Sequence, residues 1–118
     1  MIAGIARRIE EREAVFQTVR EFARLVEERI GPCSVVLFGS YARGDFNLGS
    51  DIDVLVVASG LPATFAERLA LLIGLVDAPI EPFAYTSEEF RGMQTHGHPT
   101  ARAALTEGVG VHGPWPVP

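Results

Sequence analysis

The 118-residue sequence predicts an α+β domain in which a three- to four-stranded mixed β-sheet is flanked by helices. Segments of helical periodicity alternate with short apolar runs, in the order helix, strand, short helix, strand, helix, strand, helix. Residues 54–58 are apolar at every position, which is typical of a central strand that is covered on both faces. Pro82 lies in the third strand candidate and has no N–H to donate, so that strand is expected at an edge of the sheet.

The first helix is expected over about residues 5–30, where apolar side chains recur at steps of three, four or seven. Gly31 and Pro32 end it, because glycine favours a helix C-terminus and proline cannot continue a helix. The charged residues between the apolar positions are interpreted as a solvated face. They are Glu10, Glu11, Arg12, Glu13, Glu27, Glu28 and Arg29.

The second half of the chain continues the alternation. Residues 60–64 turn the chain into a helix that residues 77–79 end, and residues 80–85 are the third strand. Thr86 and Glu89 fit a capping box that starts a short helix, and residues 99–105 predict a final helix. Residues 109–112 are a candidate short strand. The apolar stripe of the helix after residue 64 is expected to be Phe65, Leu69, Leu72, Ile73 and Val76.

Length and composition limit the classes of protein to consider. We expect residues 1–118 to form one domain, with 113–118 as a flexible Pro-rich tail or, alternatively, an anchor for a partner. The net charge of −5 argues against direct nucleic-acid binding, which needs a basic face. No apolar run approaches the ~18 residues of a membrane span, and no targeting segment stands out, so a cytoplasmic protein without membrane contact is expected. The single cysteine, Cys33, is expected to pack in the core.

Polar residues are placed where the first strand ends and where the second begins. Gly39 and Ser40 follow the first apolar run, and Asp51 and Asp53 lead into the second. These residues meet at one edge only if the two strands are antiparallel. Backbone N–H groups at a Gly-Ser turn suit a phosphate, and two carboxylates on one face of a strand suit Mg²⁺. The combination predicts a metal-dependent site for a nucleoside triphosphate.

The pattern Gly-Ser, ten residues, Asp-x-Asp resembles the signature of the DNA polymerase beta-like nucleotidyltransferase superfamily. The segments 39–44 and 50–53 are most similar to its minimal nucleotidyltransferases, small proteins often paired with a HEPN-domain partner in toxin–antitoxin modules. The resemblance implies the nucleotidyltransferase fold and transfer of a nucleoside monophosphate, AMP from ATP, to an acceptor hydroxyl. It also implies two Mg²⁺ ions as cofactor. A HEPN toxin is the expected acceptor, which would make this chain its antitoxin.

Seven residues are the expected site. The resemblance places a third acid on the strand after Asp-x-Asp, and Glu81 is the acid inside that predicted strand. If the third strand is parallel to the second, Glu81 also lies at the same edge. Arg43 and Ser50 flank the motif, and each is equally compatible with a surface arginine or a turn serine. The predicted catalytic and metal-binding residues are Asp51, Asp53 and Glu81, and the predicted nucleotide-binding residues are Gly39, Ser40, Arg43 and Ser50.

Two other functions fit the same residues. The chain could be a nucleotide-binding antitoxin without catalysis, or the accessory subunit of a two-component transferase whose partner recognises the base and the acceptor. A chain of 118 residues has little room for a second recognition module, so a partner protein is expected and a homo-oligomer stays open.

Overall fold

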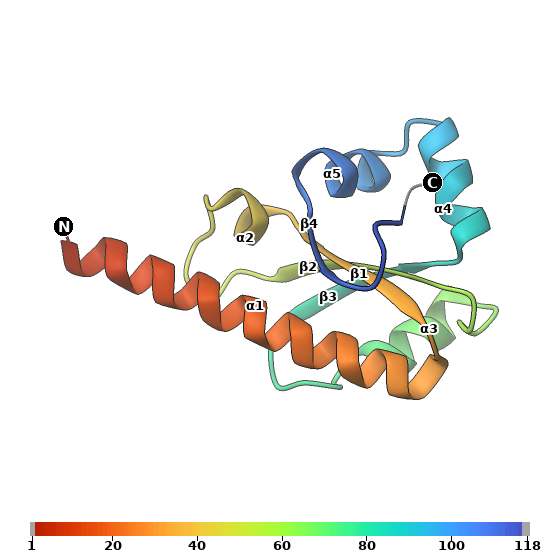
Figure 1. The fold of residues 1–118 in the computed structure, drawn as a ribbon, viewed down its shortest axis with the longest axis horizontal. Coiled ribbons are helices and arrows are strands. Elements are labelled where there is room, and N and C mark those ends of the chain that lie inside the picture. Colours follow the sequence, from red (N-terminus) through yellow and green to blue (C-terminus); the bar gives the residue numbers. More distant parts are fainter. Residues whose placement is uncertain (1, 117–118) are drawn as a thin grey trace.

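The computed structural model describes residues 2–116, and these form a four-stranded sheet with strand order β3-β2-β1-β4 (Figure 1). The predicted α+β class is confirmed, and residues 109–112 do add a strand. The elements are α1 (Ile2–Ile30), β1 (Cys33–Phe38), α2 (Ser40–Arg43), β2 (Ile52–Ala58), α3 (Phe65–Leu72), β3 (Ile80–Tyr85), α4 (Ser87–Thr95), α5 (Pro99–Glu107) and β4 (Val109–His112).

The strand pairing that the site requires is present. β1 and β2 are antiparallel, with Phe38 opposite Asp53. β2 and β3 are parallel, with Asp53 opposite Glu81, and β3 is an edge strand, as Pro82 predicts. The end of β1, the start of β2 and the start of β3 therefore lie at one edge of the sheet.

Helices cover both faces of the sheet (Figure 1). Val54 and Val56 of β2 point to the face that α1 and α3 cover, where they pack in one hydrophobic cluster. Leu55 and Val57 point to the face of α4 and α5 and pack in a second cluster. Because helices cover both faces, the side chains that β2 directs to either face are apolar. Thr86 and Glu89 form the predicted capping box at the start of α4.

The prediction for α3 was wrong in length and, for three of the five residues of the expected stripe, in orientation, whereas Leu72 is buried as predicted. The helix ends at Leu72 with Ile73 as its C-cap, and the side chains of Phe65, Leu69 and Ile73 are 61%, 47% and 58% exposed. Arg68, only 4% exposed, faces the protein instead. Its guanidinium donates to the Pro62 and Ala84 carbonyls and to the Glu89 carboxylate. These bonds satisfy the buried charge and set which face of α3 meets the sheet.

The described part of the expected tail, residues 113–116, is irregular and runs beside β4, where the Trp115 ring lies near Gly110. Residues 117 and 118 lie outside the described part of the chain. No helix among residues 2–116 combines the length and the apolar character needed to cross a membrane.

Candidate active site

Gly39 ends β1 and brings the backbone close to an acid of β2. Its φ of 77° and ψ of −154° belong to a region that residues with a Cβ rarely adopt. A Cβ built on Gly39 would overlap the carboxylate of Asp53. Glycine is therefore required at position 39 for two reasons: its backbone conformation and the close approach of Asp53.

The three predicted acids lie together at the sheet edge. Asp53 is partly buried in β2, with Glu81 as its neighbour on β3 and Asp51 two residues before it. Burial, the charge and hydrogen bonding of Glu81, and the charge of Asp51 raise the pKa of Asp53 to about 6, while Arg43 opposes this. Asp51 and Glu81 are exposed and line one groove of about 430 Å³. The geometry thus brings Gly39, Asp51, Asp53 and Glu81 together.

The donor set of this cluster fits Mg²⁺. Carboxylate oxygens are hard ligands, and Mg²⁺ is usually bound by one or two carboxylates together with substrate phosphates. Besides burial, which is the largest cause, the charges of Glu81 and Asp51 raise the pKa of Asp53, because ionised acids this close repel one another. A divalent cation would offset that repulsion, and the exposed groove leaves room for a phosphate beside it.

Ser40 begins α2 directly after the glycine and is partly buried. The first backbone bonds of this short helix are donated by Arg43 to Gly39 and by Gly44 to Ser40, at 3.0 and 2.8 Å. The N–H groups that precede them have no partner within a helix of this kind. They are the donors that the Gly-Ser turn can offer to a phosphate.

Arg43 and Ser50 make contacts that the sequence did not specify. The Arg43 guanidinium donates to Asp45 and to Glu107 at the end of α5, the latter at 2.6 Å. The Ser50 hydroxyl donates to the Asn47 carbonyl at 2.6 Å and accepts from the Asn47 N–H. Ser50 therefore closes the turn before Asp51, and Arg43 is held near the acids by its ion pairs with Asp45 and Glu107.

Two arginines of α1 support this site, and the sequence analysis missed them. Arg12, assigned to a solvated face, is partly buried and donates to the carbonyls of Tyr41 and Ala42 at 2.9 and 3.1 Å. Arg8 donates to the carbonyls of Gly44 and Phe46. Cations suit the C-terminal end of a helix. The sequence offered one signal for these contacts. Arg8 and Arg12 are four residues apart on the first helix, and the second helix is too short to satisfy its own last carbonyls.

A mixed sheet that gathers a Gly-Ser turn and three carboxylates at one edge defines the class of nucleotidyltransferases. Residues 19–91 match the family described as nucleotidyltransferase domain, and the chain belongs to that family. The expected resemblance is therefore confirmed, and the chain is a nucleotidyltransferase.

Two relatives come from Methanocaldococcus jannaschii, and the names of both describe candidate protein adenylyltransferases. The first is 30% identical over 78 residues, which are 56% of this chain and 77% of the relative. The second is 40% identical over 58 residues, which are 48% of this chain and 40% of the relative. The match thus spans less than half of the second relative.

Two solved structures share the fold. A candidate nucleotidyltransferase from Sulfolobus solfataricus has a TM-score of 0.65 at 22% identity, with 87% of this chain and 84% of that chain covered. A toxin–antitoxin structure with AMP-PNP has a TM-score of 0.56 at 21% identity, with 80% of this chain and 72% of that chain covered. At these identities the likeness concerns the fold alone.

Proposed function

We propose that this chain transfers AMP from ATP, in the presence of Mg²⁺, to a hydroxyl group of a protein partner. The observation that carries the proposal is the meeting of Gly39, Asp53 and Glu81 at one sheet edge, with Asp53 packed directly against the glycine. A phosphate-binding turn beside clustered carboxylates is what the transfer of a nucleotide requires.

The reaction joins the acceptor oxygen to the α-phosphorus of ATP. The bond between the α-phosphorus and the oxygen that leads to the β-phosphorus breaks, and pyrophosphate leaves with that oxygen. The hydroxyl proton passes to water, which reaches this edge because Asp51 and Glu81 are exposed. The products are an adenylylated acceptor and pyrophosphate.

Each predicted residue has a task in this reaction. Asp51, Asp53 and Glu81 would hold Mg²⁺, which supplies positive charge to the phosphates and to the attacking oxygen. Gly39 and Ser40 would bind phosphate through backbone N–H groups and the Ser40 hydroxyl. Such backbone donors orient the triphosphate without introducing further charge.

Arg43 is a further candidate for contact with the triphosphate. The Arg43 side chain is 45% exposed in its ion pairs with Asp45 and Glu107, so solvent screens both pairs and each contributes little to stability. A nucleotide phosphate can therefore compete for the guanidinium at little cost. Ser50 contributes indirectly, because its bonds to Asn47 shape the turn that presents Asp51.

A protein acceptor is supported by the walls of the groove beside the acids. Leu69, Ile73, Pro79 and Pro82 line it together with Asp51 and Glu81. Apolar walls around polar groups suit a protein segment, and the net charge of −5 does not suit a nucleic acid. The names of the two archaeal relatives, which describe candidate protein adenylyltransferases, point the same way. We propose a HEPN-domain toxin as the acceptor, with this chain as its antitoxin.

Labelled ATP tests the proposal. The chain is incubated with Mg²⁺ and a HEPN-domain protein, with either [α-³²P]ATP or [γ-³²P]ATP. We expect label on the partner from the α-position and none from the γ-position, and loss of transfer in EDTA. Asp53→Asn and Glu81→Gln should reduce transfer at least about 100-fold, a loss of roughly 2.7 kcal/mol of transition-state stabilisation. Asp77→Asn, an exposed acid outside the cluster, is the matched control.

The same assay distinguishes the alternatives. Mg²⁺-dependent ATP binding without any transfer, measured by calorimetry and by label, would favour an antitoxin that acts by binding alone. Label from the γ-position would contradict nucleotidyl transfer. Unchanged transfer by Asp53→Asn would show that the carboxylates have no role in the reaction.

A further inference from the structure

Three side chains of the kinds that can ligate a metal meet at the end of the sheet opposite the carboxylates. Glu27 lies near the end of α1, Cys33 is the first residue of β1, and His112 is the last residue of β4. One ligand atom from each lies within 4.8 Å of the other two. His112 Nε2 is 2.9 Å from a carboxylate oxygen of Glu27. The cluster therefore joins three elements that are far apart in the sequence.

The strand register produces this meeting. His112 pairs with Val35, so the two side chains lie on the same face of the sheet. Cys33 is two residues before Val35 on β1 and points to that face as well. Cys33 and Val35 pack with residues of α1 in one hydrophobic cluster. Glu27 approaches from α1 itself, so all three side chains share the space between α1 and the sheet.

The donor set differs in kind from that of the carboxylate cluster. A thiolate, an imidazole and a carboxylate are the ligands of Zn²⁺ and related divalent ions, at 2.0–2.3 Å, whereas Mg²⁺ prefers oxygen alone. Tetrahedral bonds of that length place ligand atoms roughly 3.3–3.8 Å apart, so the present spacing needs only a modest contraction. Three protein ligands leave a fourth position for water or another ligand.

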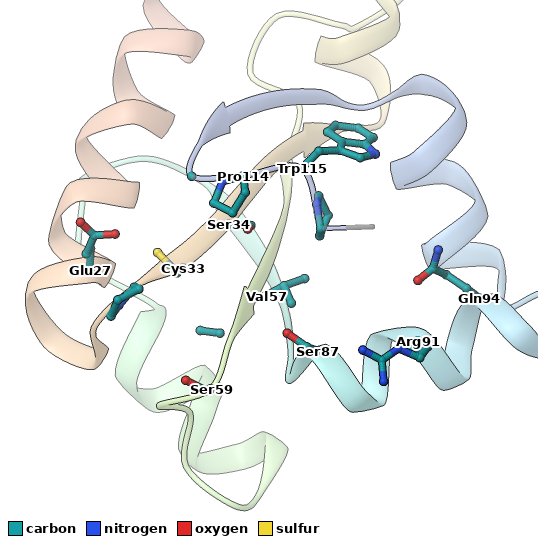
Figure 2. Close-up of a pocket in the computed structure, with 14 residues that line it drawn as sticks. Glu27, Cys33, Ser34, Val57, Ser59, Ser87, Arg91, Gln94, Pro114 and Trp115 are labelled. Atoms are coloured by element: carbon teal, nitrogen blue, oxygen red, sulfur yellow. The ribbon is translucent and has the colours of Figure 1, made fainter. Parts of the chain in front are cut away.

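Two of the three side chains also border an open groove at this end of the sheet. Glu27 and Cys33 line a groove of about 470 Å³, with the Cys33 sulfur at its wall and Arg91, Gln94 and Trp115 along the other sides (Figure 2). Cys33 is 6% exposed, while Glu27 is exposed and His112 partly so. The sulfur thus forms an inner ligand, and the other two groups lie nearer the solvent.

A cysteine beside a histidine and an acid could also act as a nucleophile. That role needs a lowered thiol pKa and an accessible sulfur. Here burial, with the charge of Glu27, raises the pKa of Cys33 to about 11, and the side chain is almost fully buried. The environment does not suit a nucleophile.

We propose that Glu27, Cys33 and His112 bind a divalent transition metal, Zn²⁺ in preference to Mg²⁺, and so fasten β4 to α1. The six residues of β1 separate this site from the nucleotide site by roughly 20 Å. The ion would therefore act on the stability and position of β4, not on the phosphates. It strengthens a link that the bond between Glu27 and His112 already makes.

Cobalt titration of the reduced, intact chain tests this site. We expect one sulfur-bound Co²⁺ per chain, with a sulfur-to-cobalt charge-transfer band and tetrahedral d–d bands that Zn²⁺ abolishes and an equal concentration of Mg²⁺ leaves unaffected. Cys33→Ser should remove the charge-transfer band. Glu27→Gln and His112→Gln should weaken binding by at least about tenfold, since losing even an outer-shell partner of a metal ligand costs that much. His96→Gln, an exposed histidine elsewhere, is the matched control and should bind as the parent does.

A second measurement tests the proposal even if the Cys33→Ser variant fails to fold. Zn²⁺ should raise the melting temperature of the parent and of Asp53→Asn, because binding to the native state alone stabilises it, and should not raise that of His112→Gln. Absence of a sulfur-to-cobalt band in the parent, or equal affinity in the parent and in His112→Gln, would overturn the proposal. The retained response of Asp53→Asn separates this site from the nucleotide site.

Discussion

Ionisation of Asp53 costs free energy in the folded chain, because the side chain is partly buried and lies beside Glu81 and Asp51. Its pKa of about 6 in the folded chain exceeds the ~3.9 of an unfolded aspartate. The native state therefore binds more protons between about pH 4 and 6, and stability falls as pH rises through that window. A shift of two units corresponds to at most ~3 kcal/mol, and partial exposure reduces this to ~1 kcal/mol.

We predict that Asp53→Asn raises the melting temperature in EDTA at pH 8 by a few degrees, because it removes that charge. The gain should vanish below pH 4, where the parent carboxyl is protonated. Thermal unfolding followed by circular dichroism at both pH values measures it, with Asp77→Asn as the control. A gain that does not depend on pH would show that the carboxyl charge is not its cause.

Gly39→Ala should damage the site through contact as well as strain. The new Cβ would overlap the Asp53 carboxylate, and φ is positive there. We expect a loss of ~1–3 kcal/mol in the free energy of unfolding and a loss of Mg²⁺-dependent ATP binding. Calorimetry and chemical denaturation measure the two effects.

Gly74→Ala is the control for that substitution. Gly74 has a similar φ of 80°, and a Cβ there would meet no atom within 4 Å. It should lose stability through strain while ATP binding is kept. If both variants bind ATP equally well, the contact between Gly39 and Asp53 has no role in the site.

The sequence was sufficient for the strands and the motif because their signals are local. Apolar runs define β1 and β2, and Pro82 alone identifies an edge strand. Contacts between distant segments were not predictable. Helical periodicity does not say which face of a helix is buried. Arg68 is buried in place of Leu69 because carbonyls and a carboxylate outside α3 bind its guanidinium, and these partners cannot be read from the helix itself. The contacts of Arg12 and Cys33 could not be predicted for the same reason, because their partners lie in other elements of the fold.

At the scale of elements, α2 is held from its C-terminal end. It has only four residues, and Arg12 of α1 binds two of its carbonyls. We predict that Arg12→Gln raises the KM for ATP about tenfold, which corresponds to ~1.4 kcal/mol, because the Gly-Ser turn at the other end of α2 loses its fixed position. Steady-state kinetics with pyrophosphate release measures it.

Arg20→Gln provides the comparison for Arg12. Both Arg12 and Arg20 lie over the Phe16 ring, but Arg20 is exposed. Its loss should leave the KM unchanged. A tenfold rise in both variants would mean that α1 acts through general stability, and unfolding curves of the two variants would then coincide.

At the scale of the whole molecule, the exposed side of α3 and the acids form one surface. Leu69 and Ile73 are 47% and 58% exposed and line the groove of Asp51 and Glu81. We predict that the double substitution Leu69→Ser and Ile73→Ser lowers transfer to the protein acceptor at least tenfold and leaves ATP binding unchanged. Label transfer and calorimetry measure the two quantities.

A matched pair of apolar residues lies on α1. Ile5 and Ile9 are 56% and 57% exposed, and serine at both positions should leave transfer unchanged if the acceptor docks beside α3. Loss of transfer in the α1 pair alone would place the acceptor on that helix instead.

The strand order also governs how the chain folds during synthesis. β1 lies inside the sheet, yet one of its two neighbours, β4, begins at Val109, about 70 residues after β1 ends at Phe38. At a ribosomal rate of about 5–20 residues per second, roughly 4–14 s pass before β4 is made. Until β4 is made, β1, whose six residues are all buried in the finished fold, keeps at least one unpaired edge. The nascent chain is thus open to edge-to-edge aggregation, and in need of a chaperone, until β4 emerges.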